Sequence, residues 1–343
     1  MKKSAIFLFL ISLIIALLGS GFVAPQHDFI KWVDFNVSYN VLLSAYKHDV
    51  DTVNQKVHCD MCEMLAYVAV KNGNRFGRKD INTLNNLVKK LKSGIRTEDL
   101  IEGNKKYYKY YLEAYRAIFA NYLDHYMTED GQKGYGLVAY HPLAKGYGFA
   151  SYDDFGNSRN YGFKRIHLGH DIFGSTGTPI IAVENGTIQE YGWNRYGGWR
   201  IGIRSDDGKR FYYYAHMRKN RPYAEGLEKG SKIVAGQVIG YMGATGYSFQ
   251  ENKNMRTNPH LHFGIQLIFD ESQVDGNGEI WIDVNNICKL LEHNRAKTVK
   301  NNENKEYKSV NLKRIIPKRH IIEIPFKDNL PFGTAKKNDA TTE

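Results

Sequence analysis

Apolar and polar positions divide the chain into four stretches of different texture. The first is an uncharged, mainly apolar run from Ser4 to about Gln26, preceded by Lys2 and Lys3. This run reaches the roughly 20 residues that a helix needs to cross a bilayer. It predicts a membrane helix over residues 1–26, with the two lysines on the cytoplasmic side and all later residues outside.

A secretory signal that is removed is the alternative interpretation of this run. Gly19-Ser20-Gly21 offers small residues for cleavage, although such signals usually have a shorter apolar core. No cysteine follows the run, which excludes a lipoprotein anchor. We expect an uncleaved anchor, and therefore a single-pass membrane protein with its main part extracellular; cleavage would make the protein secreted.

Residues 27–130 show helical periodicity, most clearly from about Phe35 to Met127. Apolar and aromatic side chains recur there at three- and four-residue spacing, which places them on one face of a helix. The repeats are Met64-Leu65-Val68, Leu84-Leu87-Val88-Leu91 and the stripe Tyr107-Tyr111-Tyr115-Ile118-Tyr122. We expect the tyrosine stripe to be buried. The region contains no catalytic constellation and is predicted to be a spacer, a lid or a module that binds a protein partner.

Residues 131–292 have the texture of an antiparallel β-domain, so the chain as a whole is predicted to be α+β. Glycine becomes dense and short β-rich runs alternate with turn signals. Three hairpins are expected around Asn185-Gly186, Asp206-Asp207-Gly208 and Ala235-Gly236. They would join residues 178–183 to 187–191, 200–204 to 210–215, and 232–234 to 237–241.

Residues 293–343 form a basic tail, predicted to be partly disordered. They contain twelve Lys or Arg and six Asp or Glu, so they supply +6 of the net charge of +11. The basic residues are not interleaved with aromatic ones, which argues against nucleic-acid binding. We expect such a tail to attract anionic cell-wall polymers instead.

The three cysteines do not form a disulfide framework. Cys59 and Cys62 have CxxC spacing, and Cys288 stands alone. The pair could be half of a zinc site or a redox pair, but no second CxxC and no thioredoxin-like pattern accompany it. We favour cysteines packed on or near a helix.

Histidine and aspartate carry the candidate chemistry. In a strand, alternate side chains share a face, so His167 lies with Asp171, and His260 lies with His262. Two such strands side by side could present His167, Asp171 and His262 to one metal ion, leaving a fourth position for water, as in catalytic zinc sites. His216 and His260 are then the candidates for acid–base work.

The region from about Gly146 to Gln266 resembles the lysostaphin-type peptidoglycan endopeptidases. The resemblance rests on order and spacing as well as on residues. The matching segments are His167-Leu168-Gly169-His170-Asp171-Ile172, Gly177-Thr178-Pro179, Asn185-Gly186, Tyr213-Tyr214-Ala215-His216, residues 230–240, residues 243–248 and Pro259-His260-Leu261-His262-Phe263.

The resemblance implies a compact antiparallel β-fold with a groove that ends at a metal. It implies that His167, Asp171 and His262 ligate Zn²⁺, and that His216 and His260 act as base and transition-state stabiliser. It also implies hydrolysis of peptide bonds in peptidoglycan stem peptides or cross-bridges during wall remodelling. Relatives often supply a substrate-facing tyrosine before the first ligand, where this chain has Tyr147, Tyr152 and Tyr161.

Two departures from the family pattern stand out. His170 occupies a usually apolar position and is interpreted as a packing or supporting residue, and the loop from Phe249 to Asn258 is longer than in minimal members. The main rival hypothesis is a catalytically silent relative that acts as an envelope scaffold or as an activator of other hydrolases. A zinc peptidase directed at proteins is a second rival, which a membrane anchor close to the cell's own wall disfavours.

Overall fold

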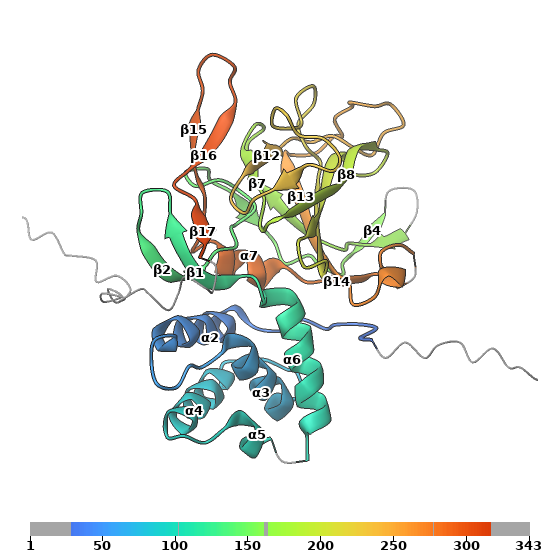
Figure 1. Ribbon diagram of the computed structural model, residues 1–343. Helices are drawn as coiled ribbons and strands as arrows, with labels where there is room; N and C mark the ends of the chain where they lie inside the picture. The colour runs from blue at the N-terminus through green and yellow to red at the C-terminus, as the bar shows by residue number, and fades with distance from the viewer. Residues whose placement is uncertain (1–28, 102, 161–163, 277, 317–343) are drawn as a thin grey trace, which may run out of the picture. The chain divides into compact units, whose positions relative to one another are not determined.

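The computed structural model describes residues 29–101, 103–160, 164–276 and 278–316. The predicted membrane segment, residues 1–26, lies outside this range. In the part that is described, no helix is both long enough and apolar enough to span a membrane. The described residues from Lys31 to Ile316 belong to one compact unit, and Figure 1 shows its helices and strands.

Five helices form the first part of this unit. They are α2 (Tyr39–Thr52), α3 (Met61–Asn72), α4 (Asp80–Lys92), α5 (Thr97–Leu100) and α6 (Lys105–Phe119). The Asp60 side chain caps α3 by accepting a hydrogen bond from the Glu63 amide, and Gly73 ends it in the left-handed conformation. The predicted helical region is therefore present.

The helical part ends earlier than the predicted Met127. Helix α6 stops at Phe119, and β1 (Leu123–Thr128) follows and pairs with β2 (Lys133–Leu137). The tyrosine stripe is buried only in part, because Tyr115 and Tyr122 are almost fully buried while the Tyr107 side chain is 62% exposed. The periodicity therefore predicted helix α6, but it did not predict that the first tyrosine of the stripe, Tyr107, is exposed.

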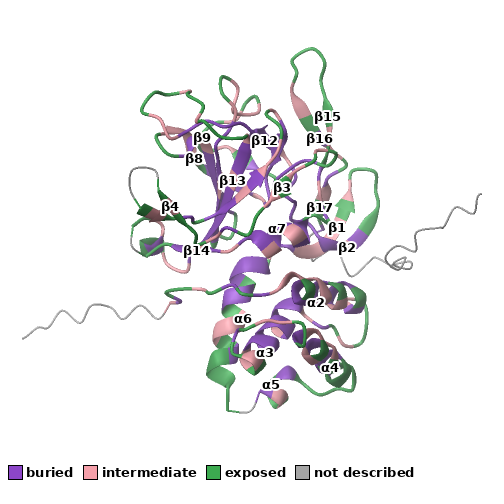
Figure 2. Ribbon diagram, turned by 180° about the vertical axis from the view of Figure 1, so that it is seen from behind, coloured by how far each residue is buried: buried purple, intermediate pink, exposed green. Residues whose placement is uncertain are grey.

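The largest sheet has eight strands, and every described strand pair is antiparallel. The order is β11 (Lys232–Ile233), β8 (Gly186–Asn194), β9 (Gly198–Ser205), β10 (Arg210–Ala215), β13 (His260–Leu267), β6 (His170–Phe173) and β3 (Ala150–Ser151), with β14 (Ile280–Ile282) also on β13. Buried residues, purple in Figure 2, run through β13 and α7 (Asn285–Leu291). The expected antiparallel β-domain is confirmed.

Only one of the three predicted hairpins forms. Strands β9 and β10 pair across the turn at Asp206–Gly208. The other two turns join strands of different sheets, because β7 (Pro179–Ile181) pairs with β12 (Val238–Tyr241) while β8 pairs with β11. The Asn185-Gly186 signal marked a real turn, but it did not determine which strand pairs with which.

Part of the predicted basic tail is folded. Residues 297–310 form the hairpin of β15 (Lys297–Lys300) and β16 (Tyr307–Val310), and β17 (Lys313–Ile315) pairs with β1. The remaining elements are the hairpin of β4 (Ser158–Asn160) and β5 (Lys164–Ile166) and the short helix η1 (Glu271–Gln273). Residues 293–316 therefore belong to the compact unit.

Two buried polar clusters connect the helices to the strands. The Arg210 guanidinium, fully buried, forms ion pairs with Glu184 at 2.8 Å and Asp207 at 2.7 Å, and also donates to the Ala117 carbonyl in α6. The second cluster centres on Asp49 of α2 and includes His58. A buried ion pair that also bonds a helix carbonyl fixes the helix against the sheet.

The Asp49 carboxylate is almost completely buried and accepts three hydrogen bonds. The donors are the His58 ring nitrogen Nε2 at 3.0 Å, the Met61 amide at 2.6 Å and the Tyr135 hydroxyl of β2 at 2.7 Å. These bonds hold the start of α3 and the first hairpin on α2. The pKa of His58 is raised above its ordinary value, chiefly by the hydrogen bond to Asp49.

All three cysteines are buried and free. Cys59 precedes α3, Cys62 lies in its first turn, and Cys288 lies in α7. None of them belongs to the cluster of potential metal ligands found among the described residues. The structure therefore shows cysteines packed against helices, the alternative favoured from the sequence.

Candidate metal centre and active site

Pairing between β6 and β13 brings two of the predicted ligands together. Asp171 of β6 stands directly opposite His262 of β13 in the register. The prediction that His167 lies on a strand is wrong. His167 lies in the short connection between β5 and β6. Its backbone is instead held by the neighbouring loop, since its amide donates to the Asn157 carbonyl and its carbonyl accepts from the Gly156 amide.

The three side chains form a compact triangle of ligand atoms. His167 Nε2 lies 3.1 Å from Asp171 Oδ1 and 3.0 Å from His262 Nδ1, and the last two atoms are 3.0 Å apart. Ligands about 2.0–2.1 Å from a tetrahedral zinc ion are separated by about 3.3 Å. Two imidazoles and one carboxylate with these separations fit a zinc ion that keeps a fourth position for water.

Asp154 and Arg159 orient the His167 ring. His167 Nδ1 lies 3.2 Å from both the backbone carbonyl and the carboxylate Oδ2 of Asp154, so it must carry the proton and donate it. Arg159 forms an ion pair with the same carboxylate and lies 3.7 Å from Asp171. In the neutral ring with this tautomer, Nε2 has the lone pair that a metal ligand requires.

Gly169 makes room for the His262 ring. A Cβ atom at this position would stand 2.5 Å from both Cε1 and Nε2 of His262, and 3.0 Å from the Phe263 carbonyl oxygen. No ordinary carbon contact is that short. The glycine between the first two predicted ligands therefore allows the third to approach them.

The two predicted catalytic histidines lie beside this triangle. The His216 ring is 4.8 Å from the His260 ring and 5.9 Å from the His262 ring, measured between centroids. Nδ1 of His216 lies 2.8 Å from the Thr245 carbonyl, and Nδ1 of His260 lies 2.9 Å from the Asn258 carbonyl. Because a carbonyl only accepts, both Nδ1 atoms are donors and each neutral ring keeps a lone pair on Nε2.

His216 has an unusual environment. It follows β10 with φ of +60°, a conformation that non-glycine residues rarely adopt. Burial lowers its pKa well below the ordinary value, and the nearby His260 and His262 lower it further. A strained backbone and a perturbed pKa in one residue are typical of functional sites.

All five predicted residues line one cavity of about 680 Å³. The predicted long loop also lines it, through residues 253–257. Among the described residues of the wall, the cationic ones are Arg159, Arg165, Lys253 and Arg256, and the only carboxylate is Asp171. The cavity is therefore suited to a substrate that carries negative charge. None of its lining residues comes from the helical region, so the described structure gives no support to a lid there.

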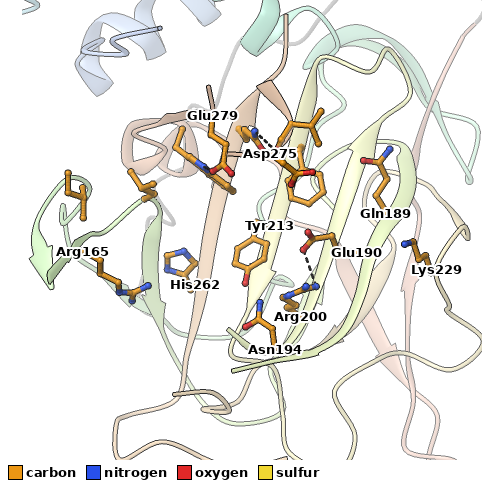
Figure 3. A pocket seen from close by; sticks show the side chains of 16 residues that line it. Arg165, Gln189, Glu190, Asn194, Arg200, Tyr213, Lys229, His262, Asp275 and Glu279 are labelled. Atoms are coloured by element: carbon orange, nitrogen blue, oxygen red, sulfur yellow. Dashed lines mark hydrogen bonds and ion pairs between the residues drawn. The ribbon is translucent and has the colours of Figure 1, made fainter. Parts of the chain in front are cut away.

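A second cavity of about 530 Å³ adjoins the first, with His262 and Arg165 lining both. Figure 3 shows His262 and Arg165 beside one another and Tyr213 further along the sheet, with Glu190 and Arg200 beyond it. The side chains of Glu190 and Arg200 form an ion pair of 3.0 Å. The two cavities together make an extended groove beside the metal ligands, whereas the resemblance implied a groove that ends at the metal.

His170 and Tyr147, two other candidates from the sequence, do not belong to the ligand triangle or to the cavity wall. His170 is buried, with Nδ1 3.9 Å from Asp154 Oδ1, and it is not part of the ligand triangle. Tyr147 packs against Tyr307, and Tyr161 lies outside the described residues. The tyrosine that lines the cavity is Tyr247, whose ring centroid is 5.9 Å from that of His216.

Comparison with known proteins agrees with this geometry. Residues 165–276 match the model of Peptidase family M23. These residues, called the M23 domain below, are similar to this family. The M23 domain is similar to the L-Ala--D-Glu endopeptidase of Bacillus subtilis (strain 168), with 39% identity over 124 residues, or 36% of each chain. It is also similar to lysostaphin of Staphylococcus staphylolyticus, with 40% identity over 120 residues, or 35% of this chain and 21% of lysostaphin.

The likeness to these two relatives spans about a third or less of their length. A solved structure from Ruminococcus gnavus ATCC 29149, assigned as a glycyl-glycine endopeptidase, covers more. It has 25% identity and a TM-score of 0.52, and the match covers 81% of this chain and 95% of that one. A match of that extent must include part of the helical region as well as the M23 domain.

Asp154, Arg159 and Gly169 were not recognised from the sequence. Gly169 could have been, because it stands between two predicted ligands where a side chain would crowd a third. Asp154 gave no signal, since it lies 13 residues before His167 in an irregular segment. The role of Asp154 depends on the turn at residues 155–156, next to which its carboxylate contacts the His167 ring.

Proposed function

We propose that this protein is a zinc endopeptidase that hydrolyses peptide bonds in peptidoglycan. The observation that carries the proposal is the triangle of His167 Nε2, Asp171 Oδ1 and His262 Nδ1, with edges of 3.0–3.1 Å. These residues would hold the ion, which would polarise the scissile carbonyl and lower the pKa of a bound water. The name of another similar protein, the peptidoglycan DD-endopeptidase ShyC of Vibrio cholerae, supports peptidoglycan as the substrate.

The chain's own residues would then move the protons. His216 is kept neutral by its lowered pKa, and its Nδ1–H is committed to the Thr245 carbonyl. Its Nε2 can therefore accept the proton of the attacking water. His260, oriented in the same way by the Asn258 carbonyl, is the second proton carrier and donates to the developing oxyanion or the leaving amine.

The charges of the groove favour a stem peptide over a cross-bridge of neutral residues. Arg159, Arg165, Lys253 and Arg256 face a cavity with one carboxylate, and metal binding would neutralise that carboxylate. Stem peptides carry free carboxylates, and a basic cavity raises the local concentration of anionic ligands. The Bacillus subtilis relative is named as an L-Ala--D-Glu endopeptidase, and glutamate is an acidic residue.

The test is to measure zinc content and release of peptide fragments from purified cell wall by the full chain. We expect one equivalent of zinc and fragment release in the wild type. His216→Ala and His260→Ala should keep the zinc and lose the release, whereas His262→Ala should lose both. Zinc without release from the wild-type protein would favour the catalytically silent scaffold or activator, and absence of zinc would contradict the metal site.

We further propose that the chain is anchored in the cell membrane by residues 1–26, with the M23 domain outside. The charge and length of that segment support this location. Protease added to intact wall-less cells should digest the M23 domain and leave the N-terminal segment in the membrane fraction. Recovery of the whole chain from the medium would instead indicate a cleaved signal.

Binding of anionic wall polymers by the basic C-terminal part is a related proposal. Truncation is a poor test, because β17 pairs with β1 and its loss would disturb the fold. Replacing the exposed Lys297, Lys300 and Lys308 with glutamine keeps the strands and removes charge. Unchanged retention of this variant on wall that carries anionic polymers would contradict the proposal.

A further inference from the structure

The groove beside the metal ligands continues to the start of the helical region. The cavity of about 530 Å³ shares Leu168, Glu279 and Trp281 with a smaller cavity of about 290 Å³. Residues 31–33, which precede the first described helix, line this smaller cavity. A continuous path therefore runs from His262 past Trp281 to Trp32, and the helical region contributes its far end.

Trp32 is held in place although it faces solvent. Its side chain is 62% exposed. The Tyr110 hydroxyl of α6 donates a 2.8 Å hydrogen bond to the Trp32 carbonyl, and the two rings lie 5.7 Å apart. Two residues later, the Asn74 side chain donates to the Asp34 carbonyl, and Phe35 is buried against Phe119. An exposed indole on a segment this well fixed binds a ligand with little loss of entropy.

The lining of the small cavity combines aromatic surface with charge. Trp32, Trp281, Leu168 and Val33 supply apolar area, and Lys31 and Glu279 supply polar groups. Glu279 is oriented by a 2.6 Å hydrogen bond from the Trp281 indole nitrogen. Sugar rings match such a lining, because their axial C–H groups pack on an aromatic face while their hydroxyl and acetamido groups reach the polar rim.

We propose that this cavity binds the amino-sugar strand of peptidoglycan while the stem peptide lies in the groove. The inference rests on the proposed function, because stem peptides are covalently attached to the glycan. A groove that holds the peptide must therefore pass close to sugar at one end. The inference gives the helical region a role in substrate binding. The match to the Ruminococcus gnavus structure, which covers 81% of this chain, likewise extends beyond the M23 domain.

A membrane surface is the other partner that an exposed tryptophan could meet, and the location of Trp32 argues against it. The ring does not stand alone on an apolar surface, but at the end of a groove that it shares with the predicted active site. Lysine and glutamate both line its cavity, which suits a neutral polar ligand better than anionic headgroups.

The test compares the full chain with Trp32→Ala for binding to glycan strands from which the stem peptides have been removed. Aromatic stacking of one ring corresponds to about a tenfold change in affinity. We expect Trp32→Ala to bind these strands about tenfold more weakly than the wild type. Trp32→Phe should retain most of the wild-type affinity. Tyr107→Ala removes an equally exposed ring of the same helical region, outside the cavity, and should bind like the wild type.

Two further measurements separate the alternatives. Cleavage of a free stem peptide without sugar should be equal in Trp32→Ala and wild type, whereas cleavage of glycan-linked peptide should fall in the variant. Equal glycan binding by wild type and Trp32→Ala, or a loss restricted to vesicles of anionic lipid, would overturn the inference. Failure of the wild type to cleave the free peptide would refute the proposed function instead, whatever the glycan binding shows.

Discussion

Gly169→Ala is the smallest change that tests the geometry of the metal centre. The new methyl group would lie 2.5 Å from two atoms of the His262 ring. Carbon atoms rest about 3.5–4.0 Å apart, so the ring or the His167–Gly169 segment must move by about 1 Å. The ligand atoms lie within 3.0–3.1 Å of one another, and metal–ligand distances tolerate only about 0.2 Å. The substitution therefore spoils the site without removing a ligand.

The expected loss exceeds that of a supporting residue. Changes behind a ligand typically weaken metal binding by about 10–100-fold. Here a ligand itself is displaced, so we expect zinc affinity to fall by at least about 100-fold, with activity falling in parallel. Crowding of the packed ring should also lower the free energy of unfolding by about 1–3 kcal/mol.

Competition with a chromogenic zinc chelator measures the affinity, and urea unfolding measures the stability. Gly148→Ala is the matched control, because its Cβ would meet nothing within 4 Å and, as at Gly169, no left-handed φ constrains it. That variant should bind zinc and unfold like the wild type. If folded Gly169→Ala bound zinc with unchanged affinity, the close approach of Gly169 to His262 would not be a constraint on the site, and the reasoning would be refuted.

Three other predictions follow from buried charge and groove charge. Arg210→Met leaves the Glu184 carboxylate buried without its cation and should destabilise the protein by about 3–5 kcal/mol in urea unfolding; the double variant with Glu184→Gln should recover part of the loss, and additive losses would contradict the pairing. The raised pKa of His58 means that its ion pair with Asp49 stabilises the fold below about pH 6.5 and that this contribution disappears as pH rises through the raised pKa; the stability difference between wild type and His58→Gln should be largest near pH 5.5 and small near pH 9, and a pH-independent difference would exclude this linkage. Arg165→Gln should raise KM for a stem peptide with a free carboxylate and leave KM for the amidated peptide unchanged; an equal effect on both peptides would show that charge recognition does not occur at this residue.

The sequence predicted which residues gather at the candidate site better than it predicted which strands pair. His260, His262 and Asp171 could be placed because the alternation of side chains along a strand is a local consequence of residue order. His167 could not be placed in the same way, because it lies in a connection whose path depends on backbone hydrogen bonds with Gly156 and Asn157, the two residues before β4. Its supporting residue Asp154 was missed for the same reason.

Strand partners were the least predictable feature. The turn at Asn185-Gly186 is real, but β7 continues toward β12 and β8 toward β9 and β11. Likewise β17 pairs with β1, which lies far away in the sequence, although the composition of residues 293–343 predicted a basic, partly disordered tail. A turn signal reports the local backbone, whereas the choice of partner depends on which apolar faces are buried together.

Strand β13 pairs with both β6 and β10, so its register fixes the positions of the site residues on all three strands. Its pairing with β6 sets His262 opposite Asp171, and its pairing with β10 sets His262 opposite Ala215, the residue before His216. Leu261, Phe263 and Ile265 alternate with the site residues and are fully buried on the other face. A slip of one residue would expose this apolar row and turn both histidines of β13 away from the groove. The energy that buries three core side chains therefore also fixes the position of four of the five candidate catalytic and ligand residues.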